Sequence, residues 1–495
     1  MCLRVFIVLC FLISHVSYAD SWLDKVKSGY QQVKERVISQ PNEESQPLKA
    51  LPTDKPEDWH YSYMQAPVFD AKIAVLQAGQ QHKESVLLVH GLGELGMQDW
   101  YSVIPYLAKS YHVIAIDLPG FGYSEKPIGR YSPANYAKVL DAVSKKYRKE
   151  SLTVVGHSMG GAVSLRFAAI APDAIDKLVL VDVAGILEKT AFIKHTGKLP
   201  IDESSIPSSL RNIIAQLNDV GGAIVEMTSI NSISRLVERS DLTWELVKHY
   251  PNVNAAISLI EEDFGETLQL INVDTRIIWG ELDGVAPLRT GKVLSAKISA
   301  AELSVIQGAG HVPMKSHPQS FQRLLSLAMA PRTIQTQTSN YSHLLERQNI
   351  TCHNENNRVY SGVYNEIKLN NCSNVELINV NANKLSVIDS LVNAENLTIV
   401  SSGSALSAIE SVLNITNGEI STTLPLELSG SRLDIAGVNI IASKNSINVS
   451  AASKLIFSVS SIHDEFYQGN VHGAFKLHDQ NIAQVLNKKN HKNVH

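Results

Sequence analysis

Short runs of consecutive apolar residues recur through the middle of this 495-residue chain. They are rich in Val and Ile, as strands buried on both faces are. The runs are SVLLVHG (85–91), HVIAID (112–117), LTVVG (152–156), LVLVD (178–182), TRIIWG (275–280) and residues 303–306. Segments between them, such as 134–149 and 160–171, have the apolar spacing of helices. This alternation predicts an α/β domain with a parallel sheet over residues 66–330.

The strand pattern stops between Gly185 and about Phe264. Helical patterns such as SSLRNIIAQL and DLTWELVKHY replace it. We therefore expect a helical cap over one end of the sheet, at about 186–264. Within this segment, GGAIVEM (221–227) is apolar, and it could face an acyl chain or pack inside the cap.

The N-terminus has the pattern of a signal peptide over residues 1–19. Arg4 precedes a nine-residue apolar stretch, and the small residues of SYA (17–19) follow it. We expect cleavage there and export to a periplasmic or secreted location. No later stretch is apolar enough to predict a transmembrane span, which needs about 20 residues. Residues 20–65 are predicted to hold an amphipathic helix (21–40) and a linker; the helix docks on the next domain or, alternatively, on a membrane surface.

A repeat begins after a polar linker predicted at 331–348. Leu385, Leu406, Leu426 and Ile447 start similar segments, spaced by 21, 20 and 21 residues. A fixed period of this size with short strands predicts a right-handed parallel β-helix over residues 349–467, in which these four side chains form one internal ladder. A β-sandwich is the alternative all-β fold. Residues 468–495, with the basic end NKKNHKNVH, are predicted to be a flexible tail.

Charge and cysteine content limit the partners and cofactors that can be expected and predict one disulfide. The formal net charge is −4, so no large basic field is available for nucleic acid. No nucleotide-binding or metal-ligand spacing is present, so no cofactor is expected. Two of the four cysteines lie in the predicted signal peptide, which leaves Cys352 and Cys372 as natural disulfide partners in an oxidising compartment.

The candidate chemistry centres on Ser158 in GHSMG, which follows a Val-rich run and precedes a helical pattern. A serine at such a sharp strand-to-helix turn projects its hydroxyl above the sheet. Gly156 and Gly160 face each other across this turn, where a Cβ would collide. The sequence therefore predicts a nucleophilic serine.

A serine hydroxyl needs a base, and the base needs a carboxylate. Asp283 in WGELDG and His311 in GAGHVPM each follow a predicted strand, where α/β sheets build their sites. We therefore predict the triad Ser158–Asp283–His311. Glu281 is the alternative acid, and His317 is a poorer candidate for the base.

Acyl transfer also requires hydrogen-bond donors for the developing oxyanion. The backbone N–H of Met159, directly after the nucleophile, is one expected donor. The N–H of Leu92, in the loop HGLGELG (90–96), is the other. His90 in this loop is predicted to be structural.

Taken in order, the motifs HGLG, DLPGFGYS (117–124), GHSMGG, WGELD and GAGHVPM resemble those of the α/β-hydrolase fold superfamily with a helical cap. The resemblance implies the triad and oxyanion hole above, with Asp117 in a structural loop beside the site. Epoxide hydrolases and haloalkane dehalogenases resemble this domain but carry Asp where Ser158 stands, which disfavours an alkyl-enzyme mechanism.

The expected function is that of an exported serine hydrolase of the esterase or lipase type, which cleaves small-molecule or lipid esters through an acyl-serine intermediate. A serine-dependent acyltransferase, a C–C hydrolase and a non-catalytic surface-binding protein are the alternatives. The repeat domain is expected to be a scaffold or a module that contacts a polysaccharide or cell surface. Asp389 and Glu410 share a repeat position, but Gly430 follows in register, so no catalytic carboxylate pair is predicted.

Overall fold

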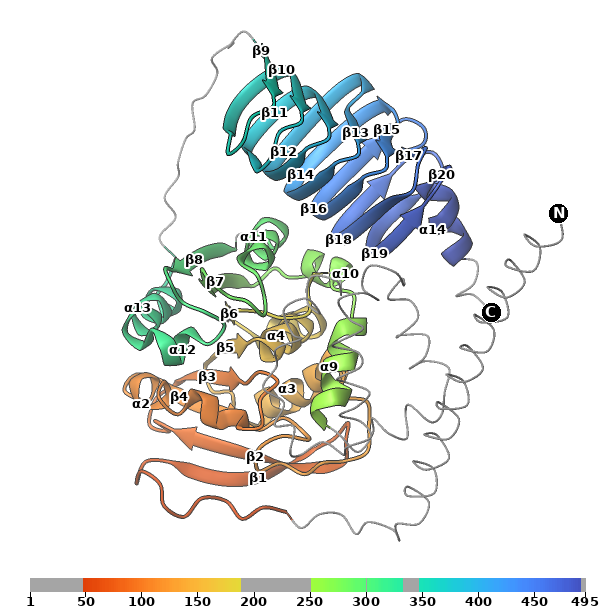
Figure 1. The fold of residues 1–495 in the computed structure, drawn as a ribbon. Coiled ribbons are helices and arrows are strands. Elements are labelled where there is room, and N and C mark those ends of the chain that lie inside the picture. Colours follow the sequence, from red (N-terminus) through yellow and green to blue (C-terminus); the bar gives the residue numbers. More distant parts are fainter. Residues whose placement is uncertain (1–47, 188–250, 300, 333–346, 491–495) are drawn as a thin grey trace, which may run out of the picture. The chain divides into compact units, whose positions relative to one another are not determined.

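The protein was analysed as a computed structural model, which describes residues 48–187, 251–299, 301–332 and 347–490 (Figure 1). Its first region contains an eight-stranded sheet in the order β1-β2-β4-β3-β5-β6-β7-β8, antiparallel at β1, β2 and β4 and parallel from β4 to β8. The strands are β1 His60–Ala66, β2 Ala71–Ala78, β3 Glu84–Val89, β4 His112–Ile116, β5 Ser151–His157, β6 Lys177–Val181, β7 Asp274–Gly280 and β8 Glu302–Ile306.

The six predicted parallel strands are therefore confirmed, whereas β1 and β2 were not foreseen. β1 (HYSYMQA) contains no continuous apolar run, because it is an edge strand whose residues are mostly half-buried or exposed. It pairs antiparallel with β2 from His60 to Ala66. The hydrolase-like domain thus begins before residue 66, and the end of the predicted 20–65 linker is a strand.

Helices cover both faces of this sheet. They are η1 Gly96–Trp100, α2 Ile104–Leu107, α3 Pro133–Tyr147, α4 Met159–Ile170, η2 Pro172–Ala174, α9 Pro251–Glu261, α10 Gly265–Gln269, α11 Leu288–Lys297, α12 Pro313–Ser316 and α13 Pro318–Met329. The predicted helices at 134–149 and 160–171 correspond to α3 and α4. One hydrophobic core lies against α3, α4 and α11, and a second lies against α2 and α13. Successive β2 residues alternate between the two cores, Val75 in one and Leu76 in the other, as the strand period of two requires.

Several expectations fall on segments outside the described residues. These are the signal peptide (1–19), the amphipathic helix (21–40), most of the cap (188–250) and most of the 331–348 linker. Within the described parts, α9 and α10 lie in or next to the predicted cap boundary. None of the described helices combines the length and apolar character needed to cross a membrane.

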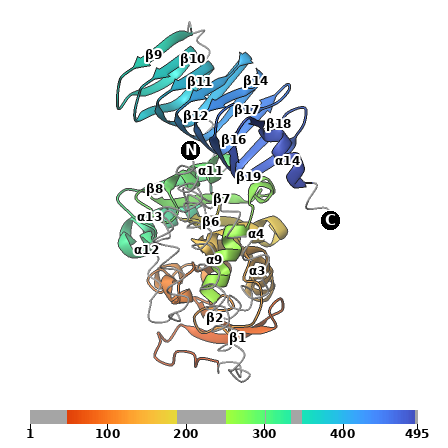
Figure 2. The same cartoon turned by 45° about the vertical axis from the view of Figure 1, so that its right-hand side comes forward.

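The second region is one 12-stranded mixed sheet that is nearly closed around a single hydrophobic core (Figure 2). Its elements are β9 Gln348–His353, β10 Val359–Asn370, β11 Val375–Ile388, β12 Leu391–Ser404, β13 Leu406–Ile409, β14 Val412–Leu424, β15 Leu426–Ser429, β16 Arg432–Ala442, β17 Ile447–Val449, β18 Ser453–His463, β19 Gln468–Leu477, β20 Gln480–Asn481 and α14 Ile482–Asn490. Pairing from β9 to β18 is parallel. A sandwich of hairpins would pair its strands antiparallel instead.

The predicted ladder of repeat positions is present. Leu385 pairs with Leu406, and Leu426 pairs with Ile447. Ser407 pairs with Glu427, so the residues directly before them, Leu406 and Leu426, are neighbours as well. All four apolar side chains are buried. The repeat period in the sequence is thus the period of strand pairing.

The flexible tail predicted from residue 468 is wrong. β19 pairs antiparallel with β18 from Leu477 to Gln468, and α14 follows it. Val471, Phe475 and Leu477 are buried in the repeat core. The apolar residues of β19 therefore cover the last strand of the repeat, an edge that would otherwise be exposed.

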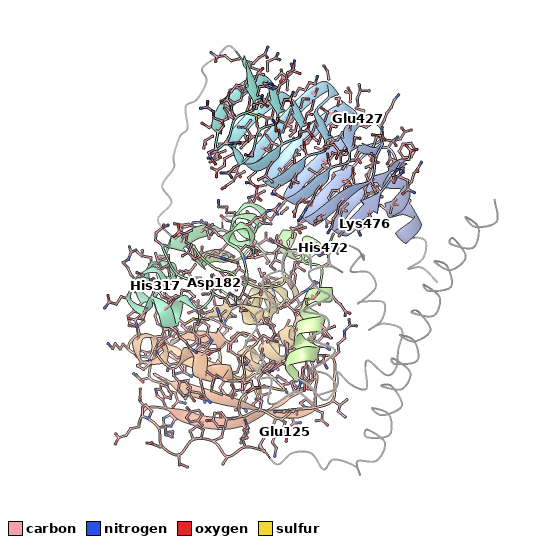
Figure 3. All side chains as sticks on the ribbon, viewed as in Figure 1. Glu125, Asp182, His317, Glu427, His472 and Lys476 are labelled. Atoms are coloured by element: carbon pink, nitrogen blue, oxygen red, sulfur yellow. A yellow bond between two sulfur atoms is a disulfide. The ribbon has the colours of Figure 1, made fainter. Side chains whose placement is uncertain are left out.

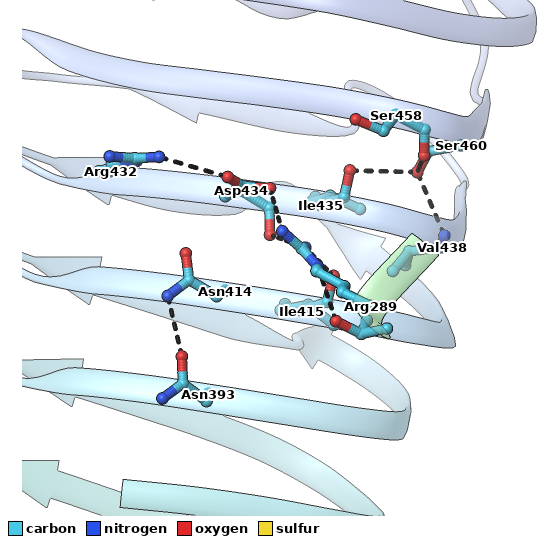
Figure 4. Close-up of polar contacts among 11 residues, drawn as sticks. Arg289, Asn393, Asn414, Ile415, Arg432, Asp434, Ile435, Val438, Ser458 and Ser460 are labelled. Carbon is cyan, nitrogen blue, oxygen red and sulfur yellow. Dashed lines mark hydrogen bonds and ion pairs between the residues drawn. The ribbon is translucent and has the colours of Figure 1, made fainter. Parts of the chain in front are cut away.

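Polar contacts join α11 to the repeat strands. The guanidinium of Arg289 donates to Thr416 Oγ1 (2.7 Å), Asp434 Oδ1 (2.8 Å) and the carbonyl of Ile415 (2.8 Å) (Figure 4). Lys297 donates to Asn439 Oδ1 (2.9 Å). The predicted disulfide between Cys352 and Cys372 is also present, between β9 and the loop before β11.

Candidate active site

Ser158 occupies the turn between β5 and α4, as the motif predicts. Its backbone is in the left-handed region, with φ 54° and ψ −120°. The turn is closely packed: a Cβ on Gly160 would lie 2.3 Å from the carbonyl oxygen of Val89, and one on Gly156 would lie 2.5 Å from that of Gly160. Contacts this short are not possible for a side chain, so both positions require glycine. The strained turn directs the hydroxyl of Ser158 away from the strand.

The three predicted triad residues meet at this turn. Ser158 Oγ lies 2.9 Å from His311 Nε2, and His311 Nδ1 lies 2.8 Å from Asp283 Oδ2. A carboxylate oxygen only accepts, so Nδ1 carries the proton and Nε2 is free to accept from the serine hydroxyl. The Asp283 side chain is fully buried, whereas 17% of the His311 side chain is exposed. The geometry therefore fits a serine nucleophile with its base and acid, the roles that the sequence predicts.

Two backbone groups hold Asp283 in place. Its Oδ1 accepts from the N–H groups of Val285 (2.7 Å) and Ala286 (2.9 Å), which leaves Oδ2 for His311. The alternative acid, Glu281, instead accepts from the N–H of Gly308 at 2.9 Å. Of the two carboxylates, only Asp283 is bonded to the imidazole in the described residues.

His317, the alternative base, does not belong to this hydrogen-bonded series. His317 caps the start of α13, and its Nδ1 lies 3.0 Å from the hydroxyl of Ser316. In the described part of the chain it forms no hydrogen bond with Ser158 or Asp283, whereas His311 bonds both.

The loop expected to supply the second oxyanion donor lies against the serine. A Cβ on Gly91 would be 3.0 Å from the Cβ of Ser158. Met159 is the first residue of α4, and the first N–H groups of a helix have no partner within the helix. The positions of Leu92 and Met159 are thus compatible with an oxyanion hole, which remains a prediction.

His90 links the loops beside the site. It is fully buried; its Nδ1–H donates to the carbonyl of Gly91 (2.6 Å), and its Nε2 accepts from the N–H of Leu118 (3.0 Å). Burial lowers the pKa of His90, and the bond from Leu118 requires the neutral ring. This is the structural role that the sequence predicts.

Asp117 holds the neighbouring loop together. Its carboxyl accepts from the N–H groups of Met97 (2.6 Å) and Tyr123 (2.8 Å). Burial raises the pKa of Asp117 to about 7, against the opposing effect of these two hydrogen bonds. The contacts agree with the structural loop implied by DLPGFGYS.

Sequence reasoning missed His157, although it stands beside the nucleophile. Its Nε2–H donates to the backbone carbonyl of His311 (2.7 Å), and the two rings lie 5.0 Å apart. Burial, followed by the nearby His311, lowers the pKa of His157 to about 4, so this ring is neutral at pH 7. It also missed Asp182, the last residue of LVLVD; its position after a strand was the same signal that selected Asp283.

No group of three or more His, Cys, Asp or Glu side chains is placed to hold a metal ion in the part of the chain that the structure describes.

This fold and site define an α/β-hydrolase fold domain, and the comparisons with known proteins agree. Residues 84–198 match the model of a family described as the alpha/beta hydrolase fold. An uncharacterized protein of Mycobacterium tuberculosis is 28% identical over 260 residues, 48% of this chain and 72% of that protein. A 2-hydroxy-6-oxononadienedioate/2-hydroxy-6-oxononatrienedioate hydrolase of Pseudomonas putida is 28% identical over 253 residues, 49% of this chain and 87% of the enzyme.

Further similar proteins include a monoacylglycerol lipase of Mus musculus, 25% identical over 261 residues, 49% of this chain and 75% of the lipase. Among solved structures, an esterase from Exiguobacterium antarcticum has a TM-score of 0.41 at 22% identity, covering 54% of this chain and 99% of the esterase. The relatives cover about half of this chain.

Proposed function

We propose that the protein is a serine hydrolase that cleaves carboxylic esters through an acyl-serine intermediate. The observation that carries this proposal is the continuous hydrogen-bonded series Ser158–His311–Asp283, with both distances below 3 Å. It ends on a serine at a strained strand-to-helix turn. That arrangement is the one that makes a serine hydroxyl nucleophilic at neutral pH.

The first half of the reaction forms the acyl-enzyme. Ser158 Oγ attacks the ester carbonyl while His311 Nε2 takes the hydroxyl proton, and the buried Asp283 carboxylate stabilises the resulting imidazolium. The N–H groups of Met159 and Leu92 stabilise the negative charge on the carbonyl oxygen. His311 then gives its proton to the leaving alcohol.

In the second half, water attacks the acyl-serine. His311 acts again as the base, and collapse of the tetrahedral intermediate returns the proton to Ser158 and releases the acid. The neutral His157 supports this cycle by holding the backbone of His311 through its carbonyl.

Ester cleavage is favoured over C–C cleavage because a triad and an oxyanion hole suffice for it. The monoacylglycerol lipase similarity supports an ester substrate. C–C hydrolysis is the second candidate because of the Pseudomonas putida relative. Acyl transfer to an alcohol shares the same acyl-enzyme, and a non-catalytic surface-binding protein is the remaining alternative.

The test is turnover of p-nitrophenyl esters of increasing acyl length by the full chain and by Ser158→Ala, with Ser316→Ala as an exposed-serine control. We expect hydrolysis by the wild type and the control, and a loss of about 10³-fold or more in Ser158→Ala. Turnover of a 2-hydroxy-6-oxo-dienoate in place of every ester would instead establish the C–C reaction. Equal turnover by wild type and Ser158→Ala would refute both.

We also infer that residues 349–467 form a right-handed parallel β-helix and act as a scaffold or polysaccharide-binding module. Parallel pairing between residues 20 to 22 apart in the sequence supports the β-helix. We infer export from the N-terminal signal pattern, and the Cys352–Cys372 disulfide agrees with an oxidising compartment. Detection of the protein with residues 1–19 attached in the cytoplasm alone would refute export.

A further inference from the structure

Asp182, labelled in Figure 3, is a buried acid at the end of a strand next to the one that carries the serine turn. It directly follows β6 and is completely buried. Its backbone is left-handed, with φ 44°, and its N–H donates to the carbonyl of Ile278 on β7 (3.2 Å). Aspartate adopts this conformation more readily than most non-glycine residues, so Asp182 forms a sharp turn at the end of the strand without a glycine.

The residues on either side of Asp182 hold the backbone of the nucleophile. The N–H of Ser158 donates to the carbonyl of Val181 (2.9 Å), and the N–H of Ala184 donates to the carbonyl of Ser158 (3.3 Å). The turn that carries Asp182 is therefore bonded to the turn that carries the serine.

The two oxygens of Asp182 have different surroundings. Oδ1 accepts from the N–H of Gly280 at 2.8 Å. Oδ2 is buried and receives no hydrogen bond from an N–H or O–H donor in the described structure. The carbonyl of Gly280, the residue that donates to Oδ1, accepts from the N–H of Asp283 (3.3 Å), so the carboxyl of Asp182 lies beside the turn that carries Asp283. Two carboxyl groups can share a hydrogen bond only if one of them carries a proton.

The partners of Asp283 decide which acid carries that proton. Asp283 accepts from Val285, Ala286 and His311, and all three of these groups are donors. Asp182 accepts from one backbone N–H only. Ionisation is therefore favoured at Asp283, and burial together with the Asp283 charge raises the pKa of Asp182 well above its ordinary value.

We propose that Asp182 is a positioning residue, a protonated carboxyl whose Oδ2–H donates to the carboxylate of Asp283 and fixes that carboxylate against His311. This inference rests on the proposed function. The bond adds to the contacts that Asp283 makes with the N–H groups of Val285 and Ala286, and it joins the acid to the turn that holds the serine backbone. The titratable group that acts on Asp182 is Asp283 from the loop after β7, and Asp283 is bonded in turn to His311 from the loop after β8.

The test compares three variants of the full chain by kcat and KM for a short-chain p-nitrophenyl ester across pH. Asp182→Asn keeps an N–H donor and tolerates the left-handed backbone. Asp182→Gly relieves the backbone but removes the donor. Asp176→Asn, directly before β6 at the other end of that strand, is the control. We expect kcat to fall about 10- to 100-fold in Asp182→Gly with little change in KM, and to be largely retained in Asp182→Asn.

The acid limb of the kcat/KM profile separates a protonated from an ionised Asp182. If Asp182 is neutral, Asp182→Asn removes no charge, and the limb stays in place. If Asp182 is ionised, the same change removes a negative charge near His311 and moves the limb about one pH unit or more toward acid. That shift, or wild-type kcat in Asp182→Gly, would overturn the proposal. If Asp182→Gly does not fold, the Asp182→Asn profile decides.

A spectroscopic readout tests the protonation without turnover. Infrared spectra of the wild type minus Asp182→Asn at pH 8 should contain the carbonyl stretch of a buried, protonated carboxylic acid. Asp117, whose pKa burial also raises, is present in both proteins and cancels in the difference. Absence of the band refutes a protonated Asp182 even if the protein cleaves no ester, so the two proposals can fail separately.

Discussion

The two sheets of this protein use the left-handed backbone region in different ways. In the hydrolase-fold sheet, Ser158 and Asp182 adopt it where strands end beside the site. In the repeat sheet, the residues that adopt it are mostly asparagines at turns, and many of them pair with each other. Asn371 Nδ2 donates to Asn354 Oδ1 (2.7 Å), and Asn396 Nδ2 donates to Asn379 Oδ1 (2.8 Å).

This difference separates structural strain from functional strain. Asparagine adopts the left-handed region at low cost, and in three pairs of repeat asparagines one amide donates to the next across neighbouring turns. Serine and aspartate at 158 and 182 gain no such compensation from their own side chains. One contacts the base of the triad, and the other has a buried oxygen without a donor. At 158 and 182 the left-handed backbone coincides with groups of the candidate site.

The same comparison explains why two carboxylates share a repeat position. Asp389, Glu410 and Gly430 all have positive φ values, of 46°, 45° and 59°. Their shared position is a turn, and the N–H of Asp389 donates to the carbonyl of Ile409 while that of Glu410 donates to the carbonyl of Ser429. Their shared register therefore comes from the turn.

The largest expected effect concerns the acid of the triad. Asp283→Ala should lower kcat by about 10³-fold or more, because His311 loses the group that orients and stabilises its protonated form. Glu281→Gln, two residues away, should stay within a few-fold of the wild type, because Glu281 bonds only the Gly308 N–H among the contacts described. Steady-state kinetics with an aryl ester measure both. A larger loss in Glu281→Gln would reverse the assignment.

A smaller effect is expected of acidic pH on the stability of the hydrolase-fold domain. Burial, followed by the charge of Lys149, lowers the pKa of His112 to about 4 in the folded protein. The unfolded chain, with a His pKa near 6.5, binds more protons between these values, so stability is full above pH 6.5 and is lost as the pH falls toward 4. The free energy of unfolding should therefore fall between pH 7 and pH 5, and this fall should be smaller by about 1–2 kcal/mol in His112→Gln.

Urea unfolding at the two pH values, followed by tryptophan fluorescence, measures this change. All five tryptophans precede residue 280, so the signal reports on the first region and not on the repeats. His60→Gln, at an exposed position of β1, is the control. An unchanged pH dependence in His112→Gln would show that other groups cause the acid sensitivity.

The smallest effects are expected in the repeat sheet. Ser411 Oγ accepts from the N–H of Ser390 (3.1 Å) inside the core, so Ser411→Ala leaves a buried donor unpaired and should cost about 1–2 kcal/mol. Asn414 belongs to the outer amide ladder through Asn393 (2.9 Å; Figure 4), and Asn414→Ala should cost less than about 0.5 kcal/mol. Calorimetric unfolding measures both, and kcat should not change. A loss of kcat in either variant would mean that the repeat contributes to the site.

The periodic parts of this fold could be predicted from the sequence. Continuous apolar runs gave the six parallel strands, and the 20- to 21-residue period gave the ladder from Leu385 to Ile447. Edge strands lack such runs, which is why β1 and β19 were missed. They are determined by the sheet edge that they cover, and this edge exists only in the folded chain.

For the site, motif spacing selected Ser158, Asp283 and His311, and the structure brings their side chains within hydrogen-bond distance. Asp182 has the same position after a strand that selected Asp283, but spacing could not reveal the contacts of Asp182 or of His157. Nε2 of His157 donates to a backbone carbonyl, and Oδ2 of Asp182 is buried without a donor in the described structure. Such orientations depend on how three strand ends meet, and no local pattern records them.

The central claim is that the strained serine carries an activated hydroxyl. Intact-mass and peptide analysis after treatment with a fluorophosphonate at pH 7 tests it most directly, with His311→Ala treated in parallel. The account predicts one adduct per chain on the peptide that contains Ser158, and labelling of His311→Ala that is slower by orders of magnitude. A folded wild-type protein that stays unlabelled, or that is labelled at another residue, would contradict it.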